Sequence, residues 1–158
     1  MFSTETTKCS CGCCGNKCKF NPCAVTCGQC VENFGDYAYV YNTTAQTVTA
    51  GDAFTFSDNG PLSGSITHTA GTENIVINRT GMYLVTFYVD TGVTDGEATL
   101  YKNSQPVQGG VYPAQYGQVI ISAQTGDVIT LVNTSSVEVS LAELGGEVDA
   151  SMTIIRLF

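Results

Sequence analysis

The stretch Gly81–Val89 reads GMYLVTFYV and decides the fold class of this chain. Aromatic and β-branched residues dominate it, and side chains alternate between two faces in an extended strand. One face carries four apolar side chains: Tyr83, Val85, Phe87 and Val89. The opposite face carries three more: Met82, Leu84 and Tyr88. A strand that is apolar on both faces needs protein on both sides, which indicates a layered β-structure.

The chain after residue 36 has the same character throughout. About ten short segments rich in Val, Ile, Thr, Tyr and Phe follow one another at spacings typical of an all-β sandwich or barrel. These segments are 37–41, 46–49, 53–56, 66–68, 74–77, 82–89, 97–102, 118–123, 127–133, 137–142 and 148–157. Turn residues lie between them, at Asp58–Pro61, Asp95-Gly96, Gly109-Gly110 and Gly145-Gly146. No segment shows a helical period, so we predict an all-β body.

Two more segments, Val128–Val132 and Met152–Phe158, are also apolar on both faces. Each sheet of a sandwich has one inner face, so the second apolar face needs a cover of its own. A long loop is one candidate cover and a second subunit is the other. We favour the second subunit, because a large exposed apolar patch promotes association.

All eight cysteines lie within the first thirty residues, and none follows. They are Cys9, Cys11, Cys13, Cys14, Cys18, Cys23, Cys27 and Cys30. A segment this short cannot build a core, whereas its thiols can form covalent links. We therefore predict two parts, a cysteine-rich connector arm at 1–35 and a β-domain at 36–158.

Disulfide cross-links are the first interpretation of the eight thiols, and their pairing is not fixed by the spacing. Thiolate binding of zinc or copper is the alternative, based on Cys27-Gly28-Gln29-Cys30 and on the run Cys9, Cys11, Cys13. The N-terminus shows no apolar segment of signal-peptide length, so we expect synthesis in a reducing cytosol. Disulfides would then form after the protein leaves that compartment.

Charge is divided unevenly along the chain, whose formal net charge is −8. Residues 1–30 carry Lys8, Lys17 and Lys19 against Glu5, which leaves +2. The remaining residues carry three cations against thirteen acids, which leaves −10. Such a body repels nucleic acid and anionic lipid, so neither is an expected partner. No apolar run is long enough to cross a membrane as a helix.

Catalysis has little support in the sequence. His68 is the only histidine, and we expect it to be a solvated strand residue rather than a catalytic base. No Gly-x-Ser-x-Gly motif is present. Calcium at Asp58-Asn59 or Asp95–Glu97 is a weak alternative, because neither loop offers enough charged oxygens at fixed spacing. We expect no enzyme activity, no cofactor and no metal site in the body.

Four pieces of the body carry a family resemblance in order: Ala38–Asn42 (AYVYN), Gly81–Val85 (GMYLV), Gly126–Leu131 (GDVITL) and Ala150–Leu157 (ASMTIIRL). They resemble the C-terminal head of BclA-type collagen-like glycoproteins on bacillus spores, within the complement- and tumour-necrosis-factor-like group. The resemblance implies a ten-stranded jelly roll that forms a tight trimer. In that setting the candidates for the trimer interface are Met82, Leu84, Tyr88, Ile129, Leu131, Ile155 and Leu157.

The chain departs from that family in lacking a Gly-X-Y tract before the head. With the cysteine-rich arm in its place, it resembles a subunit of thin pilus-like endospore appendages. That resemblance implies stacked heads, disulfide-locked joins, a spore-surface location without a signal peptide, and an anchor protein on the spore. An extended arm of thirty residues reaches roughly 100 Å, enough to cross into a neighbouring head.

Two function classes follow from these features. The first is a structural subunit of a self-assembling fibre, in which the head trimerises and the arm connects it to the next trimer. The second is a ligand-binding or adhesive trimeric head that its thiol-rich arm merely anchors. Removal of the arm separates them, because only the fibre needs the arm for its activity.

Overall fold

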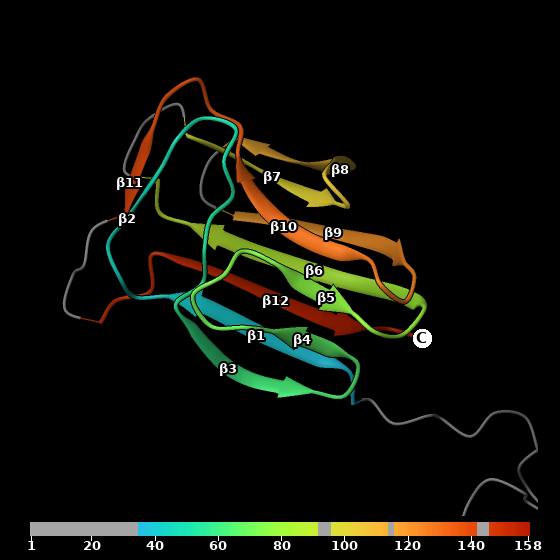
Figure 1. Ribbon diagram of the computed structural model, residues 1–158. Helices are drawn as coiled ribbons and strands as arrows, with labels where there is room; N and C mark the ends of the chain where they lie inside the picture. The colour runs from blue at the N-terminus through green and yellow to red at the C-terminus, as the bar shows by residue number, and fades with distance from the viewer. Residues whose placement is uncertain (1–34, 92–95, 114–115, 142–145) are drawn as a thin grey trace, which may run out of the picture. The chain divides into compact units, whose positions relative to one another are not determined.

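The computed structural model describes residues 35–91, 96–113, 116–141 and 146–158, and residues 35–158 form one unit. Twelve strands lie within the described residues (Figure 1). They are β1 (Tyr37–Asn42), β2 (Gln46–Val48), β3 (Asp58–Ser63), β4 (Ile66–His68), β5 (Ile75–Ile77), β6 (Gly81–Val89), β7 (Glu97–Lys102), β8 (Gln105–Pro113), β9 (Tyr116–Ala123), β10 (Val128–Asn133), β11 (Val139–Leu141) and β12 (Ala150–Arg156). The all-β prediction is confirmed. In these ranges no helix is long and apolar enough to cross a membrane.

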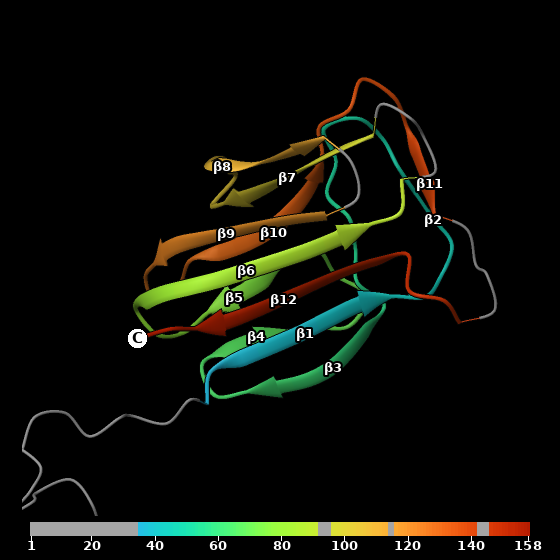
Figure 2. The same ribbon diagram turned by 180° about the vertical axis from the view of Figure 1, so that it is seen from behind.

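The strands form two five-stranded antiparallel sheets and one small pair. The first sheet has the order β3-β1-β12-β6-β9, and the second has the order β4-β5-β10-β7-β8. Strands β2 and β11 pair separately at one end of the molecule. Figure 2 shows the first sheet in front, with β6, β12 and β1 side by side and the second sheet behind them.

The core lies between the two sheets and is built by alternation. Along β6 every second side chain from Tyr83 to Val89 is buried, and the intervening ones are half-buried. Phe54, Phe56 and Phe87 are among the largest fully or almost fully buried side chains. Phe54 and Phe56 lie in a segment predicted as a strand, which instead forms two isolated bridges, from Ala53 to Val132 on β10 and from Phe56 to Thr72 in the β4–β5 connection.

The predicted turn at Asp58–Pro61 is wrong, because these residues begin β3. Strand β3 lies at the edge of its sheet, where proline is tolerated because one side of the strand needs no ladder hydrogen bonds. Gly60 is required there, since a Cβ on it would lie 2.5 Å from the ring of Tyr39 on β1. A register shift between Ala38 and Val40 accompanies this close approach.

The predicted turn at Gly109-Gly110 is also wrong, because both residues lie inside β8. Strand β8 is the edge of the second sheet, and its register against β7 shifts between Thr99 and Tyr101. Gly109 has φ of 75°, a conformation that favours glycine, so the pair forms an edge bulge instead of a hairpin turn.

Candidate assembly face and the two ends of the head

The outward face of the first sheet is the candidate functional surface, and the strand register arranges it in rows. Pairing aligns Tyr37 with Ile155, Ile155 with Leu84, and Leu84 with Ile120. These four residues form an apolar row across β1, β12, β6 and β9. Ile120 is 56% exposed, and Tyr37 and Ile155 are each 40% exposed. An exposed row of this length is unusual on a protein that remains alone in water.

A second row lies four residues further along each strand. Pairing aligns Tyr41 with Ser151, Ser151 with Tyr88, and Tyr88 with Tyr116. Tyr116 is 59% exposed. Burial, followed by the charges of Asp90 and Asp149, raises the pKa of the Tyr88 hydroxyl, so this phenol stays neutral as a hydrogen-bond donor. This row is aromatic where the first is mainly aliphatic.

Between the two rows lies a polar band. It consists of Thr153, Thr86 and Gln118, aligned by the same register, and it begins at Tyr39 on β1. The Tyr39 ring stacks on that of Tyr41 with 5.3 Å between ring centroids. Hydroxyl and amide groups at this point supply directional hydrogen bonds within a surface that is otherwise apolar. We name the two rows and this band the assembly face.

The assembly face holds three of the seven sequence-derived interface candidates, Leu84, Tyr88 and Ile155. Met82, paired to Ser122, lies on the same side of the sheet beyond the apolar row. Leu157 follows the end of β12 and is also exposed. Whether these residues contact another subunit stays a prediction.

Ile129 and Leu131 are a correction to that set. Both are fully buried inside the sandwich on β10, so neither offers a surface to a second subunit. Their strand belongs to the second sheet, and it is Val128 and Thr130 that are half-buried on its other side. An apolar pattern on both faces of β10 did not reveal which face the first sheet covers.

Sequence reasoning missed the polar band and five aromatic or aliphatic residues of the face: Tyr37, Tyr39, Tyr41, Tyr116 and Ile120. Three of them alternate with the buried Ala38, Val40 and Asn42 along β1. That alternation of large tyrosines with smaller residues was the available signal, since the inward side chains of a sandwich must fit between two sheets. The positions of Tyr116 and Ile120 depend on the pairing of β9 with β6, which has no local signature.

One end of the head, where residue 35 enters β1, gathers the cations of the domain. Asp36 accepts a hydrogen bond from the Ser65 amide at 3.2 Å, and its other oxygen lies 3.5 Å from Arg79 Nη1 and 3.9 Å from Arg156 Nε. Lys102 Nζ lies 3.6 Å from Asp127 Oδ2. We name these five residues the arm end. Every cation here has a carboxylate beside it.

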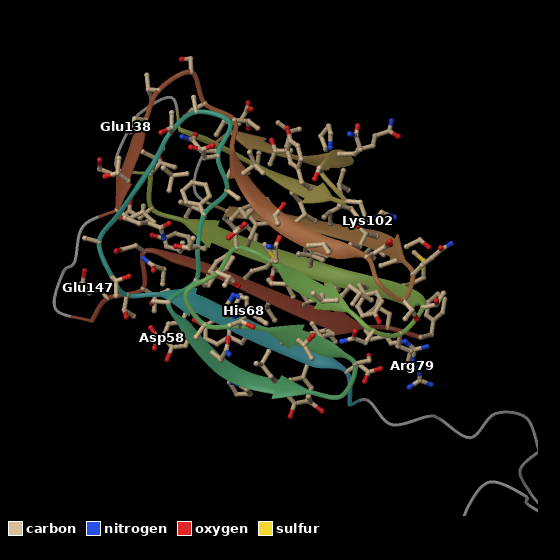
Figure 3. The ribbon with its side chains drawn as sticks, viewed as in Figure 1. Asp58, His68, Arg79, Lys102, Glu138 and Glu147 are labelled. Atoms are coloured by element: carbon tan, nitrogen blue, oxygen red, sulfur yellow. The ribbon has the colours of Figure 1, made fainter. Side chains whose placement is uncertain are left out.

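The opposite end is acidic. Pairing aligns the end of β1 with the start of β12 and the end of β6, which brings Asp90 and Asp149 together, and Asp58 begins β3 at the same end of the sheet. Figure 3 shows Asp58, Glu138 and Glu147 at this end, with Lys102 and Arg79 at the other. We name Asp58, Asp90, Glu138, Glu147 and Asp149 the acidic end. The three Lys and Arg residues of 31–158 all lie at the arm end.

Asp149 is the most confined of these acids. Its side chain is 6% exposed, and its Oδ2 atom is buried without a hydrogen-bond partner among the described residues. Burial, followed by the charges of Asp90 and Glu147, raises the pKa of its carboxyl group. Negative charge is therefore concentrated around Asp149.

His68 is not solvated as predicted. It is 9% exposed, and its ring nitrogens approach Asn59 Oδ1 on β3 and the Thr72 carbonyl oxygen at 3.0 Å. Asn59 Nδ2 also donates to the His68 carbonyl oxygen at 3.2 Å. The ring thus joins β3 to the β4–β5 connection, which is a structural role.

Metal ligation gains no support from the described ranges, where no three His, Cys, Asp or Glu side chains are placed to hold an ion. Asp58 Oδ2 instead accepts hydrogen bonds from Thr43 Oγ1 at 3.0 Å and from Ser57 Oγ at 2.6 Å. Asp95 and all eight cysteines lie outside the described residues.

Comparison with solved structures shows the fold. The chain is similar to Eiger TNF from S. frugiperda, with a TM-score of 0.60 and 16% identity over 80% of this chain and 94% of that one. It is also similar to murine APRIL, with a TM-score of 0.54 and 11% identity over 78% and 99% of the two chains. The vertex protein of PRD1 matches with a TM-score of 0.50 and 13% identity over 80% and 99%. The jelly-roll expectation is thereby confirmed.

The family comes from the sequence match. None of the curated proteins matches the chain. The family model described as the BclA C-terminal domain, in contrast, matches residues 38–158, which includes all twelve strands except the first residue of β1. The protein therefore belongs to the BclA C-terminal domain family.

Proposed function

We propose that the protein is a structural subunit of a spore-surface fibre. Its head forms a homotrimer through the assembly face, and residues 1–35 connect one trimer to the next through cysteine cross-links. Membership of the BclA C-terminal domain family supports the spore-surface location, and we expect no enzyme activity from such a head. An anchor protein on the spore would hold the base of the fibre.

The observation that carries the proposal is the outward face of the first sheet. The side chains on a solvated sheet face are normally polar. This face instead carries an aligned row of four apolar or aromatic residues, Tyr37, Leu84, Ile120 and Ile155. Burying such a row against a second copy removes apolar surface from water at about 25 cal/mol per Å². The flanking tyrosines add rigid contact area at low cost in side-chain entropy.

The cysteines support the connecting role of the arm. Eight thiols in thirty residues allow bonds both within and between chains. Disulfides between trimers would give the fibre kinetic resistance, since separation then requires a covalent bond to break. Thiolate binding of zinc or copper by the same cysteines is the alternative, and it predicts joins that a chelator opens.

Electron microscopy of negatively stained full-length protein tests the fibre. We expect filaments from the full chain and discrete particles from a shortened chain that starts at Val31. Loss of filaments under a strong reductant identifies disulfides as the join, and loss under a chelator identifies a metal. Discrete particles from both chains contradict the fibre and leave an adhesive trimeric head.

Light scattering of the shortened chain tests the assembly face separately. Ile120→Lys places a charge in the apolar row, and we expect the particle mass to fall from three protomers to one. Because Ile120 is more than half exposed, the protomer itself accommodates a lysine there. Thr47→Lys on β2, at an exposed position outside the face, is the matched control and keeps the trimer mass. Equal masses for both variants contradict the assignment.

A further inference from the structure

The head is electrically polarised along the direction of its strands. Lys102, Arg79 and Arg156 lie at the arm end and face Asp36 or Asp127. At the acidic end lie Asp58, Asp90, Glu138, Glu147 and Asp149, which come from four separate stretches of the sequence. Like charges held together in this way repel one another and attract a cationic group.

Asp149 indicates that this end receives a cation. Its carboxylate is buried beside two other acids, with one oxygen lacking a partner in the described part of the chain. Burial raises the free energy of an ionised carboxylate, and a positive charge held close by at the surface lowers it again, so this end favours a cationic group. A metal ion fits less well, because no three ligating side chains in the described ranges are placed to hold one.

We propose that the acidic end of one head binds the lysine-bearing segment, residues 1–34, of a second copy of the chain. This inference rests on the proposed function, in which that segment connects trimers, and it names the surface on which the segment docks. Lys8, Lys17 and Lys19 supply the cations, against a single acid, Glu5, in the first thirty residues.

Reach and polarity agree with this arrangement. Extended, residues 1–34 span at most roughly 110 Å, whereas β6, with its 9 residues, is about 30 Å long. Each chain carries its lysines before β1, where the head is cationic, and its acidic surface where β1 ends. Docking the arm of one head on the acidic end of the next therefore orients all heads in the same direction along a filament.

Zero-length carbodiimide cross-linking of full-length protein, under conditions that give filaments, tests the docking site. Mixing ¹⁵N-labelled with unlabelled chains identifies links between copies by mass spectrometry. We expect Lys8, Lys17 or Lys19 to link to Glu138, Glu147 or Asp58 of another copy. The pair Lys102–Asp127, 3.6 Å apart, gives an internal link that shows the reagent has reacted.

The outcomes separate the two proposals. Filaments with the Lys102–Asp127 link, but with arm lysines linked elsewhere or not at all, overturn the docking site and leave the fibre intact. An absence of filaments overturns the fibre itself, and the docking site with it.

A matched pair of single substitutions gives an independent measurement. At low salt we expect Glu147→Gln to slow filament growth by at least about threefold, because charges at the rim of a contact govern the association rate. Asp127→Asn removes one charge from the opposite end of the head, beside Lys102, and leaves the rate unchanged. Equal rates for the two variants overturn the assignment.

Discussion

The two ends of the head treat charge in opposite ways. At the arm end Asp36 and Asp127 each lie beside a cation and accept backbone or side-chain hydrogen bonds. At the acidic end Asp149 lies buried beside Asp90 and Glu147, with one oxygen unpartnered among the described residues. The fold therefore stabilises the carboxylates at the arm end, whereas at the acidic end it holds Asp149 in a position that disfavours its charge.

The pKa shifts express the same contrast. Hydrogen bonds from the Gln124 amide and then from Asn103, together with the charge of Lys102, lower the pKa of the Asp127 carboxyl below its usual value. Burial and neighbouring acids raise the pKa of Asp149. One carboxylate is thus stabilised by folding and the other is destabilised, so their removal has opposite effects on stability.

The largest expected effect comes from breaking the arm end at Asp36. Asp36→Ala removes the acceptor of the Ser65 amide and the carboxylate that lies 3.5 Å from Arg79 and 3.9 Å from Arg156. We expect a loss of about 2 kcal/mol in the free energy of unfolding, measured by urea denaturation at fixed protomer concentration. Asp36→Asn is the control that keeps an acceptor oxygen for Ser65 and loses less. A loss within error would show that the arm end is not compensated as described.

A smaller loss is expected from Asp127→Asn. The substitution removes the ion pair with Lys102 and weakens the hydrogen bonds to the turn at 124–127. We expect the free energy of unfolding to fall by about 1 kcal/mol at neutral pH. The folded-state pKa lies below the ordinary value of 3.8, so the stabilisation is complete above 3.8 and is lost as the pH falls through the folded pKa. Denaturation at neutral pH and below pH 3.8 checks both statements. A difference that persists at the lowest pH contradicts them.

The opposite sign is expected at the acidic end. Asp149→Asn removes a buried charge and keeps the shape of the side chain. We therefore expect the free energy of unfolding to increase by about 0.5 kcal/mol at neutral pH. The folded-state pKa lies above 3.8, so the wild type is favoured below 3.8 and loses that stability as the pH rises through the folded pKa. The gain of the variant should therefore shrink on acidification. Destabilisation by Asp149→Asn at neutral pH would remove the contrast between the ends.

The smallest effect sharpens the comparison through salt. Raising the salt concentration from about 0.05 M to about 0.5 M shortens the screening length and weakens repulsion among the acids. We expect this change to raise the midpoint temperature of unfolding by a degree or two more for the wild type than for a Glu138→Gln/Glu147→Gln variant. The difference corresponds to about 0.3 kcal/mol in the free energy of unfolding. Equal salt responses would place the repulsion elsewhere.

Much of the fold could be predicted because β-structure leaves a local signature. Alternation in Gly81–Val89 identified an interior strand of the first sheet, and the same pattern located most other strands. Predictions were wrong where an edge strand contains turn residues, at Gly60-Pro61 and Gly109-Gly110. An edge tolerates glycine and proline because its outer side forms no ladder, and edge position is not visible in a local pattern.

The candidate site was only partly accessible from the sequence for a related reason. Leu84 and Leu131 look alike in a pattern that is apolar on both faces, yet one is half-buried on the outer face and the other is fully buried in the core. The prediction for His68 was wrong because its partners come from elsewhere in the fold. Asn59 lies on β3 of the other sheet, and Thr72 lies in the connection between β4 and β5. Burial depends on distant strands, which local periodicity does not specify.

By itself, the sequence determined the all-β class, the membership of the BclA C-terminal domain family, and the division of the chain into a cysteine-rich, cationic arm and an acidic body. These properties depend on composition and on a period of two residues, both of which are local. Only the tertiary structure decided which apolar face points outward and that the acids gather at one end. Antiparallel register aligns residues such as Tyr37, Leu84, Ile120 and Ile155 from four strands, and it is fixed by packing of the whole sandwich.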